Sequence, residues 1–511
     1  MRLWNAQLDA EQYKNPILPL DYSDPDAIRV GEDYYMVASS FTYLPGVPVL
    51  HSRDLVNWER LGYCVSSLPF ARYAHPAHGC GTWAPAIRFH NGTFYVFIPL
   101  PDEGIFVTES KDPAGPWSPL RCIRRASGWI DPCPLWDDDG KVYMVHAFAN
   151  SRCGIKHRLQ MSTLDPETLA VTGDGPVIFD GRLSQPTAEG PKLYKRCGKY
   201  YIFIPAGGVG QGWQTVLRAD NIYGPYEEKI VLHQGNTAVN GPHQGAWVDA
   251  PDGSDWFLHF QDADACGRVV HLQPMCWKGG WPFIGQEQNG DGIGEPVAQW
   301  RMPAGGRYDA TIEASDDFTA RTLSLPWQWQ ANPDSAWYEC TGRGLKLFIE
   351  PARAEQSIWE LPNVLSQMLP AADFNVEVKL ALHAEQGGCC GIGILGQSYS
   401  LTELVRTVGG YMLSLRQGIV EGIGPCDAAQ ETKLASVPIQ ENEITLYAEI
   451  TRGCRVQYFY KGRHIARTPL GNALPVTRGV WTGARFALYA HARAVQGTGF
   501  GCIGGVTFAP R

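Results

Sequence analysis

The sequence predicts an all-β protein with more than one domain, and two features of its 511 residues lead to this prediction. The chain contains 17 Trp, 22 Tyr, 56 Gly and 37 Pro, a mixture that favours many short strands joined by tight turns over long helices. Hydrophobic residues make up 44% of the chain and charged residues 19%, which is ordinary for a folded globular protein. Disordered and coiled-coil chains are therefore excluded, and the length allows roughly two to four domains.

Five aromatic segments indicate an internal repeat. Each follows a turn signal that contains glycine, so each is expected to be the second strand of a β-hairpin. The repeat length of about 50 to 60 residues suits one four-stranded propeller blade with its loops. The sequence therefore predicts a five-bladed β-propeller. The segments are DYYMVAS from Asp33, TFYVFIP from Thr93, KVYMVHA from Lys141, KYYIFIP from Lys199 and DWFLHF from Asp255.

The strand before each turn is expected to line the propeller axis. Aligned on their apolar residues and followed back by four positions, these strands give Asp24, Trp83, Asp131, Glu189 and His243. Because side chains alternate between the two faces of a strand, the five residues are expected to converge on one central pocket if the strand geometry continues that far.

The pattern changes at about residues 307–317. Strand-like runs without the aromatic-hairpin period then continue to the C-terminus, including NVEVKLAL, EITLYAEI and ARFALYAHA. About 200 residues with seven or more alternating strands fit an antiparallel β-sandwich. The predicted domains are a propeller of residues 1–306 and a C-terminal β-sandwich of residues 307–511.

Charge and hydropathy exclude two classes of partner. The formal net charge is −9 and no block of Lys and Arg is present, which argues against nucleic acid. No stretch approaches the ~20 apolar residues of a membrane span, and MRLWNAQLDAEQYKNPILPL lacks the apolar core of a signal peptide. A cytoplasmic protein that binds neither nucleic acid nor membranes is expected.

The 14 cysteines form no C-x-x-C pair, so the spacing of zinc ribbons and redox dithiols is missing. Cys389 and Cys390 are adjacent, and the others are scattered through expected strands. This distribution favours buried reduced thiols over a disulfide framework.

Three of the five axial residues are acidic. Carboxylates that face one aromatic pocket repel one another, so their pKa values are expected to diverge. Glycoside hydrolysis needs this divergence, because one carboxyl must donate a proton to the leaving oxygen while another, ionised, activates water. Asp24, kept extended by Pro25, suits the base; Glu189, beside the flexible Gly190, suits the acid; Asp131 can tune the acid. A lone Asp before Pro is typical of a turn, but three acids at equivalent repeat positions favour catalysis.

Five further residues are candidates for ligand binding. Trp83, Phe41 and Tyr43 could stack on the apolar face of a sugar ring, or could simply fill the core. Arg268 could bind sugar hydroxyls and depress the pKa of the base, or could be a surface cation. His243 could bind a metal ion or order a water molecule, or could be a satisfied core histidine.

The motifs resemble those of glycoside hydrolase family 43, the five-bladed-propeller group of β-xylosidases, α-L-arabinofuranosidases and arabinanases. The resemblance runs through NPILPLDYSDPDAI, FTYLPGVPVLHSRDLVNWERLG, GTWAPAIRFHNGTFYVF, WIDPCPLWDDDGKVYMV, TAEGPKLYKRCGKYYIF and GRVVHLQPMCWKGGWP. It continues into SDDF and LSLPWQWQANPDSAW, which are similar to the β-sandwich of the xylosidase-type members. The implied fold is a five-bladed β-propeller followed by a lectin-like (concanavalin-type) antiparallel β-sandwich.

The resemblance also implies chemistry. It implies an inverting mechanism with Asp24 as general base, Glu189 as general acid and Asp131 as modulator of the acid's pKa and orientation. It implies an axial Ca²⁺ held by His243 and water, without an organic cofactor, and places Arg268 beside the terminal sugar. A pocket closed at one end, partly by a loop of the sandwich, implies exo action on oligosaccharides. The expected reaction removes terminal β-D-xylose, and also α-L-arabinofuranose, from xylooligosaccharides or hemicellulose fragments.

Several alternatives remain open from the sequence. The main activity could be that of an α-L-arabinofuranosidase, because the two sugars present similar hydroxyl groups near the reacting carbon. Retaining fructan hydrolases carry Asn-Asp-Pro and Arg-Asp-Pro motifs where this chain has SDP and IDP. A non-catalytic sugar-binding propeller and a protein-interaction scaffold would not require the acidic set. The oligomeric state is left open, with a homo-oligomer among the options.

Overall fold

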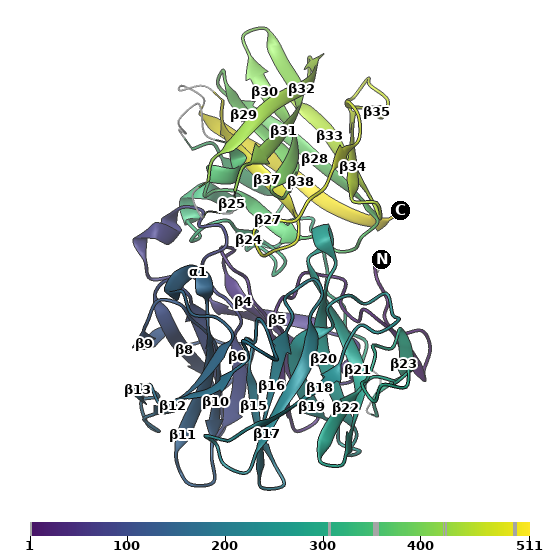
Figure 1. Ribbon diagram of the computed structural model, residues 1–511. Helices are drawn as coiled ribbons and strands as arrows, with labels where there is room; N and C mark the ends of the chain where they lie inside the picture. The colour runs from purple at the N-terminus through teal and green to yellow at the C-terminus, as the bar shows by residue number, and fades with distance from the viewer. Residues whose placement is uncertain (1–2, 305–307, 351–356, 423, 425–426, 494–497) are drawn as a thin grey trace.

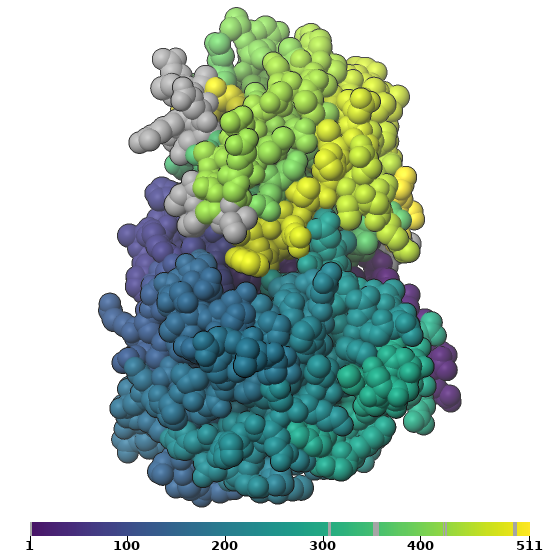
Figure 2. All heavy atoms as spheres, viewed as in Figure 1, coloured from purple at the N-terminus to yellow at the C-terminus, as the bar shows by residue number. Residues whose placement is uncertain are grey.

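The structure, a computed structural model, describes residues 3–304, 308–350, 357–422, 424, 427–493 and 498–511. It confirms the all-β prediction: a propeller of radiating sheets forms one domain and a β-sandwich is seated on its upper face (Figure 1). The space-filling view shows the two domains in contact across a broad face (Figure 2). The predicted boundary between residues 1–306 and 307–511 falls within 305–307, outside the described residues.

The propeller consists of five antiparallel sheets, each of which follows the chain order of its strands. Tight turns at Gly31, Gly92, Gly140, Gly198 and Gly253 join the first two strands of each blade, as predicted. The five blades are β2 (Asp26–Val30), β3 (Asp33–Val37), β4 (Gly46–Ser52) and β5 (Glu59–Val65); β6 (Ala86–His90), β7 (Thr93–Leu100), β8 (Gly104–Ser110) and β9 (Arg121–Arg125); β10 (Trp129–Trp136), β11 (Val142–Phe148), β12 (Arg158–Leu164) and β13 (Val171–Gly173), with β14 (Val177–Asp180) also paired to β12; β15 (Lys192–Arg196), β16 (Lys199–Ala206), β17 (Trp213–Ala219) and β18 (Glu227–Leu232); and β19 (His243–Asp249), β20 (Asp255–Asp262), β21 (Arg268–Lys278) and β22 (Trp281–Ile284).

Apolar side chains from neighbouring blades pack face to face, which explains why the second strands are buried on both faces. Between the first two blades, for example, Val37 and Val49 pack with Ile87 and Val96. Equivalent clusters join the second blade to the third, the third to the fourth and the fourth to the fifth. Burial of these faces is the main favourable contribution to the free energy of folding in this domain.

The ring is closed by segments from its two ends. Strand β1 (Gln12–Lys14) pairs with β23 (Gln299–Arg301), and Leu18 forms a bridge to Val270 of β21. One apolar cluster contains residues of both the first and the fifth blade. The first blade is thereby fixed next to the last, so that the five first strands surround one axis.

The C-terminal domain consists of two packed antiparallel sheets. Their inner faces share one large apolar core. One sheet has the order β24 (Gln328–Trp329), β27 (Leu365–Met368), β37 (Arg485–Ala492), β29 (Gly388–Leu395), β30 (Ser398–Thr407), β31 (Gly410–Val420) and β32 (Ala429–Ile439). The other has the order β25 (Tyr338–Cys340), β26 (Leu345–Phe348), β38 (Gly499–Pro510), β28 (Phe374–Ala384), β33 (Glu443–Thr451), β34 (Arg455–Lys461) and β35 (Thr468–Pro469), with β36 (Leu474–Pro475) also paired to β34.

The loop after the first hairpin of the propeller joins the two domains. Leu44 forms a bridge with Trp329 of β24, and the Arg485 guanidinium lies 3.9 Å from the centre of the Tyr43 ring. Farther along, the His78 ring stacks on Trp359 at 3.6 Å. The sandwich is therefore fixed over the side of the propeller from which this loop emerges.

Helical structure in the described part of the chain is limited to single turns, and none could cross a membrane. The described cysteines are free thiols, as predicted. Six of them are buried, but Cys122, Cys197 and Cys276 are exposed, so the predicted burial is confirmed only in part. The turns are η1 (Ala71–Ala74), α1 (Asn150–Cys153), η2 (Asp264–Cys266), η3 (Ser335–Trp337) and η4 (Ile358–Glu360).

Candidate active site

Asp24, Asp131 and Glu189 converge at the centre of the propeller from three blades. Asp24 and Glu189 lie just before β2 and β15, whereas Asp131 lies within β10. Asp24 and Asp131 are 5% and 3% exposed, and Glu189 is half-buried. Burial is the main cause of the raised pKa values of Asp131 and Glu189; the charges of Glu189 and Asp24 raise that of Asp131 further, and the charge of Asp24 raises that of Glu189 further. The backbone N–H next to Glu189 also donates to Asp131, so these carboxyls share one site.

The reason for this convergence differs from the prediction. Regular alternation along a strand does not extend to all five aligned residues, because β2, β6 and β15 begin after Asp24, Trp83 and Glu189. Asp24 and Asp131 instead have left-handed backbone conformations, with φ of 56° and 55°. A non-glycine residue rarely adopts this conformation, and it is typical of functional sites. The left-handed turn before β2 directs Asp24, and a shift of the pairing register between Ile130 and Cys133 within β10 directs Asp131, so strand periodicity is not the cause.

Asp24 is held by three donors. The hydroxyl groups of Ser39 and Ser23 donate to its Oδ2 at 2.6 and 2.9 Å. Arg268 donates from Nη1 to its Oδ1 at 3.0 Å, forming a buried ion pair. The structure therefore places Arg268 beside the expected base, which excludes the alternative of a surface cation. A carboxylate held by these donors has a fixed orientation.

Glu189 and Asp131 are positioned as a pair. The N–H of Gly190, next to Glu189, donates to Asp131 Oδ2 at 2.7 Å. Gly190 has φ of 53°, and an added Cβ would lie 2.8 Å from Pro205, so only glycine fits here. Burial raises the pKa of Asp131 to about 8, with a contribution from the charge of Glu189. Burial and the charge of Asp24 raise the pKa of Glu189 to about 7, although the positive charges of Arg268 and Lys156 lower it in part. This pair retains a proton near neutral pH.

The raised pKa of Asp131 has a consequence for stability. Between its ordinary pKa of 3.8 and its folded value of about 8, the folded state binds a proton that the unfolded state releases. This contribution to stability is complete below pH 3.8 and is lost as the pH rises towards 8. Asparagine does not titrate, so Asp131→Asn does not lose this stability as the pH rises. The Tm of Asp131→Asn minus that of wild type is therefore expected to increase from pH 4 to pH 8. Thermal melts across this range test the expectation, and a difference that is independent of pH would contradict it.

The three aromatic residues predicted to stack on a sugar lie in two different environments. Trp83 is half-buried and contacts Phe41 edge to face at 6.1 Å, so these two rings form one wall near the axis. Tyr43 is 3% exposed, and Arg485 covers one face of its ring. The position of Tyr43 favours a role in domain packing over stacking on a sugar.

A loop of the sandwich narrows the site. The Trp481 ring lies edge to face with Trp83 at 6.3 Å, and 42% of Trp481 remains exposed. A cavity of about 290 Å³ lies between this loop and the fifth blade, and Arg268, Val480 and Trp481 are among its lining residues. Sequence reasoning expected a loop of the sandwich here but did not identify Trp481, because no local signal connects it with the propeller.

His243 is the first residue of β19 and is 1% exposed. Its Nδ1 donates to the carbonyl oxygen of Gly241 at 2.6 Å, which leaves Nε2 with a free lone pair. Burial lowers the pKa of His243 to about 4, so the ring is neutral at pH 7, as a metal ligand must be. A Cβ on Gly212 would lie 3.0 Å from Nε2 and obstruct it. The donor chemistry fits a single protein ligand to an axial ion.

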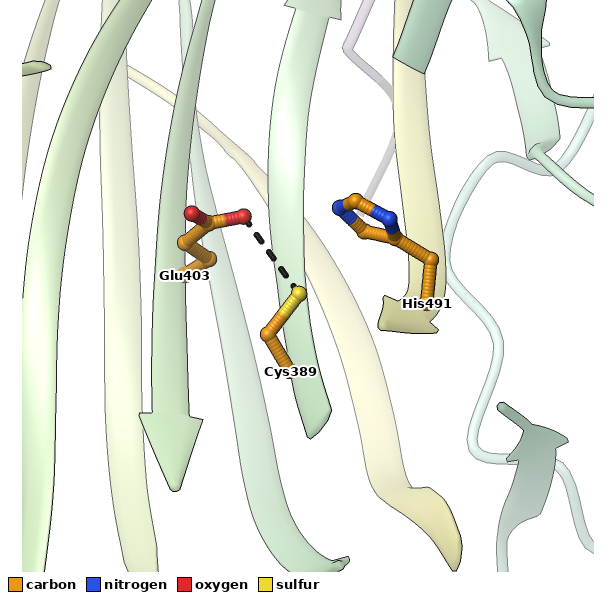
Figure 3. A group of neighbouring side chains, drawn as sticks. All are labelled: Cys389, Glu403 and His491. Carbon is orange, nitrogen blue, oxygen red and sulfur yellow. Dashed lines mark hydrogen bonds between the residues drawn. The ribbon is translucent and has the colours of Figure 1, made fainter. Parts of the chain in front are cut away.

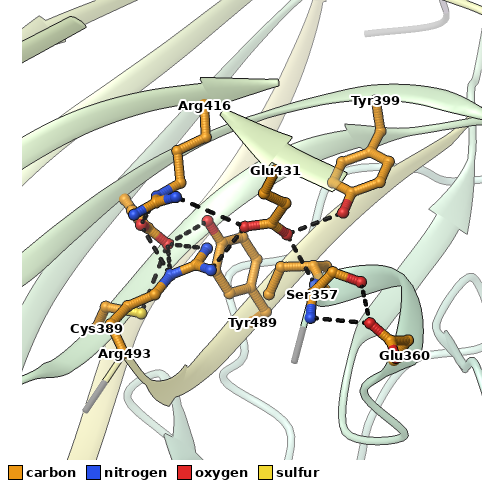
Figure 4. A network of polar contacts seen from close by, with 10 residues as sticks. Ser357, Glu360, Cys389, Tyr399, Arg416, Glu431, Tyr489 and Arg493 are labelled. Atoms are coloured by element: carbon orange, nitrogen blue, oxygen red, sulfur yellow. Dashed lines mark hydrogen bonds and ion pairs between the residues drawn. The ribbon is translucent and has the colours of Figure 1, made fainter. Parts of the chain in front are cut away.

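A second group of possible metal ligands lies in the sandwich, outside this site. Cys389, Glu403 and His491 are buried, with one ligand atom of each within 4.8 Å of the others (Figure 3). However, the Glu403 carboxylate already accepts hydrogen bonds from Arg416, Arg493, Tyr489 and Cys389. These four partners of Glu403 are labelled in Figure 4.

Two guanidinium groups therefore occupy the positions that a cation would need around this carboxylate. Burial alone would raise the pKa of Glu403, but the charge of Arg493 lowers it to about 2. Arg493 also pairs with Glu431, which extends the network across the sheet. The group is a buried ionic network of the sandwich, in which each charge is compensated by a neighbour.

Three carboxyls at one axis, with raised pKa values for Asp131 and Glu189 and an arginine paired with Asp24, are the arrangement expected of a hydrolase of glycosidic bonds. The chain belongs to glycosyl hydrolases family 43, whose family model matches residues 13–282. A second model, described as a beta xylosidase C-terminal concanavalin A-like domain, matches residues 315–500. The predicted family and both predicted domain types are confirmed.

Individual relatives agree with this assignment. A Xylanibacter ruminicola protein with a provisional beta-xylosidase name is 43% identical over 405 residues, covering 76% of this chain and 74% of its own. A non-reducing end alpha-L-arabinofuranosidase of Bacteroides ovatus is 28% identical over 404 residues, covering 74% of this chain and 73% of its own. A solved structure, a bifunctional GH43-CE protein of Bacteroides eggerthii, has a TM-score of 0.84 at 27% identity and covers 98% of this chain and 64% of that one.

Proposed function

We propose that this glycoside hydrolase removes terminal β-D-xylose from the non-reducing ends of xylooligosaccharides, with inversion at the anomeric carbon. The convergence of Asp24, Asp131 and Glu189 beside Arg268 carries the proposal. The description of the C-terminal family model and the beta-xylosidase name of the X. ruminicola relative support xylose as the sugar.

Each of the three carboxyls has a separate role in the proposed reaction. Asp24 takes a proton from a water molecule as the water oxygen bonds to the anomeric carbon. Glu189 gives its proton to the glycosidic oxygen as that bond breaks, so the products are free xylose and a shortened oligosaccharide. Asp131 stays in place, holds the backbone beside Glu189 and helps to keep a proton in the pair. Proton exchange with solvent then restores Asp24 and Glu189.

The surroundings of the three acids suit exo action on a single terminal sugar. The half-buried Trp83 offers an aromatic surface to the apolar face of a pyranose ring, and Phe41, which is 3% exposed, packs edge to face against Trp83. Trp481 narrows the opening from the side of the sandwich. Arg268 can donate to sugar hydroxyls while it remains paired with Asp24. A site narrowed in this way favours a chain end over the interior of a polysaccharide.

α-L-Arabinofuranose is the second candidate sugar. The B. ovatus relative named for this activity supports it. Hydrolysis of 4-nitrophenyl β-D-xylopyranoside, 4-nitrophenyl α-L-arabinofuranoside and xylobiose, measured side by side, tests the proposal. Xylose release from the xyloside and xylobiose is expected, and proton NMR should show α-xylose first. No turnover of either aryl glycoside would overturn the proposed function, and β-xylose as the first product would overturn inversion.

The raised pKa of Glu189 predicts the alkaline side of the pH profile. The acid works protonated, so kcat/KM is expected to fall as the pH rises through about 7. The decline should approach about tenfold per pH unit. A profile of kcat/KM on xylobiose between pH 4 and pH 10 measures it. An alkaline limb centred near 4.5, the ordinary value for a glutamic acid, would contradict the proposed burial effect.

We also propose that His243 binds an axial Ca²⁺ through Nε2, with water as the other ligands. When bound, the ion would add positive charge and order water near the axis. Treatment with a chelator is expected to lower both Tm and kcat/KM, and added Ca²⁺ should restore them. In His243→Ala, the chelator should change neither quantity. Wild-type protein that is indifferent to the chelator in both measurements would overturn the calcium site.

A further inference from the structure

A fourth buried carboxylate, Asp21, lies where the two domains meet and takes no part in the chemistry proposed above. It is 5% exposed. Its Oδ1 accepts the backbone N–H of Arg268 at 2.8 Å, and its Oδ2 accepts the backbone N–H of Gly483 at 2.8 Å. Asp21 precedes the first blade, Arg268 begins β21 of the fifth blade, and Gly483 precedes β37 of the sandwich. One side chain thus joins three segments from both domains.

The backbones around Asp21 approach one another very closely. A Cβ on Gly267 would lie 2.3 Å from Asp21 Cγ, and a Cβ on Gly483 would lie 2.7 Å from the nitrogen of Gly267. Ala484 also donates its N–H to the carbonyl oxygen of Ala265 at 2.7 Å. The turn before Arg268 therefore has little room to move relative to the sandwich while these contacts are present.

These contacts lead directly to the active site. The Arg268 backbone is held by Asp21, and the Arg268 guanidinium is paired with Asp24. Gly483 lies two residues after Trp481, whose ring contacts Trp83. A displacement of the Asp21 carboxylate would be transmitted to the ion pair on one side and to the sandwich loop on the other.

We propose that Asp21 is a positioning residue through which the β-sandwich sets Arg268 and the Trp481 loop relative to Asp24. This inference rests on the proposed roles of Asp24 and Arg268. Both Asp21 oxygens already accept backbone N–H groups, so Asp21 acts through Arg268 rather than on the sugar. The sandwich thereby becomes part of the catalytic geometry instead of an appended module.

Asp21→Asn is the most conservative test. An amide has one acceptor oxygen and one NH₂ group, so it can satisfy only one of the two N–H donors and presents a donor to the other. Asp54 provides a matched control in the β4–β5 turn, because it is 2% exposed and its Oδ1 accepts the N–H groups of Val56 and Asn57 at 2.9 and 2.7 Å. Asp54 contacts neither Arg268 nor the sandwich in any interaction described for the chain.

The two variants are compared in the full-length protein by thermal melts and by kinetics on 4-nitrophenyl β-D-xylopyranoside. Both are expected to lose about 2–4 °C in Tm. Asp21→Asn should also lose about 10- to 100-fold in kcat/KM, because a small misplacement of a positioning group has an effect of this size. Asp54→Asn should retain the wild-type kinetics. If Asp21→Asn does not fold, the smaller side chain of Asp21→Ser is measured by the same criteria.

A double-mutant cycle with Arg268→Ala separates positioning from general destabilisation. If Asp21 acts through Arg268, adding Asp21→Asn to Arg268→Ala should cost much less than it costs in wild type. Additive losses, or an Asp21→Asn kcat/KM equal to that of Asp54→Asn, would overturn the inference. These outcomes differ from failure of the proposed function, in which wild type and Asp54→Asn would both lack activity on the xyloside.

Discussion

Glu189→Gln is expected to reduce kcat on xylobiose by about 10³- to 10⁴-fold. Glutamine has nearly the same shape as glutamic acid but has no proton to give to the departing glycosidic oxygen. The alcohol that leaves from xylobiose is a poor leaving group without protonation, so the full effect of the missing acid should be seen with this substrate. Steady-state release of xylose measures the loss.

Leaving groups of different acidity identify the role of Glu189. An aryl xyloside with a strongly acidic phenol needs little protonation, so Glu189→Gln should retain far more of its activity on that substrate than on xylobiose. Sugar binding, measured by calorimetry, should persist. Glu295→Gln is a suitable control, because Glu295 is a fully buried acid in the segment between β22 and β23, and its Oε2 accepts the N–H of Asn236. Equal losses on both substrates would contradict the assignment of Glu189 as the acid.

Asp24→Asn is expected to reduce kcat/KM by about 10³- to 10⁴-fold on every substrate. Every turnover requires water to attack the anomeric carbon, whatever leaves, so an activated phenol should not relieve this defect. The amide oxygen can still accept a bond from Ser39, but the charge that pairs with Arg268 is lost. The fold is expected to persist.

The ratio of activities on xylobiose and on the activated aryl xyloside therefore distinguishes the two residues. It should fall sharply in Glu189→Gln and stay near the wild-type value in Asp24→Asn. Circular dichroism and Tm show whether each variant is folded. An Asp24→Asn enzyme that hydrolyses the activated xyloside at a rate near wild type would exclude Asp24 as the base.

The β-sandwich shows which strands can be predicted from local sequence patterns and which cannot. Alternating runs such as NVEVKLAL and EITLYAEI predicted β28 and β33, because each run places its apolar residues on one face. In contrast, β29 contains three glycines in GCCGIGIL and lacks this alternation. The neighbouring strand β30 explains Gly391, since a Cβ there would lie 2.2 Å from the carbonyl oxygen of Thr402. No sequence pattern reports such a close approach.

The sequence by itself determined the five-fold hairpin repeat, the sandwich and the identities of the acids at the axis. These follow from properties of neighbouring residues: the period of apolar side chains, glycine in the turns and the chemistry of each carboxyl group. Tertiary structure alone decided the turned backbone of Asp24 and Asp131, the pairing of Asp24 with Arg268 across 244 residues and the contact of Asp21 with Gly483 across 462. The physical reason is that hydrogen bonds and ion pairs depend on tenths of an ångström and on direction, and residues so far apart acquire these only when blades and sandwich pack together.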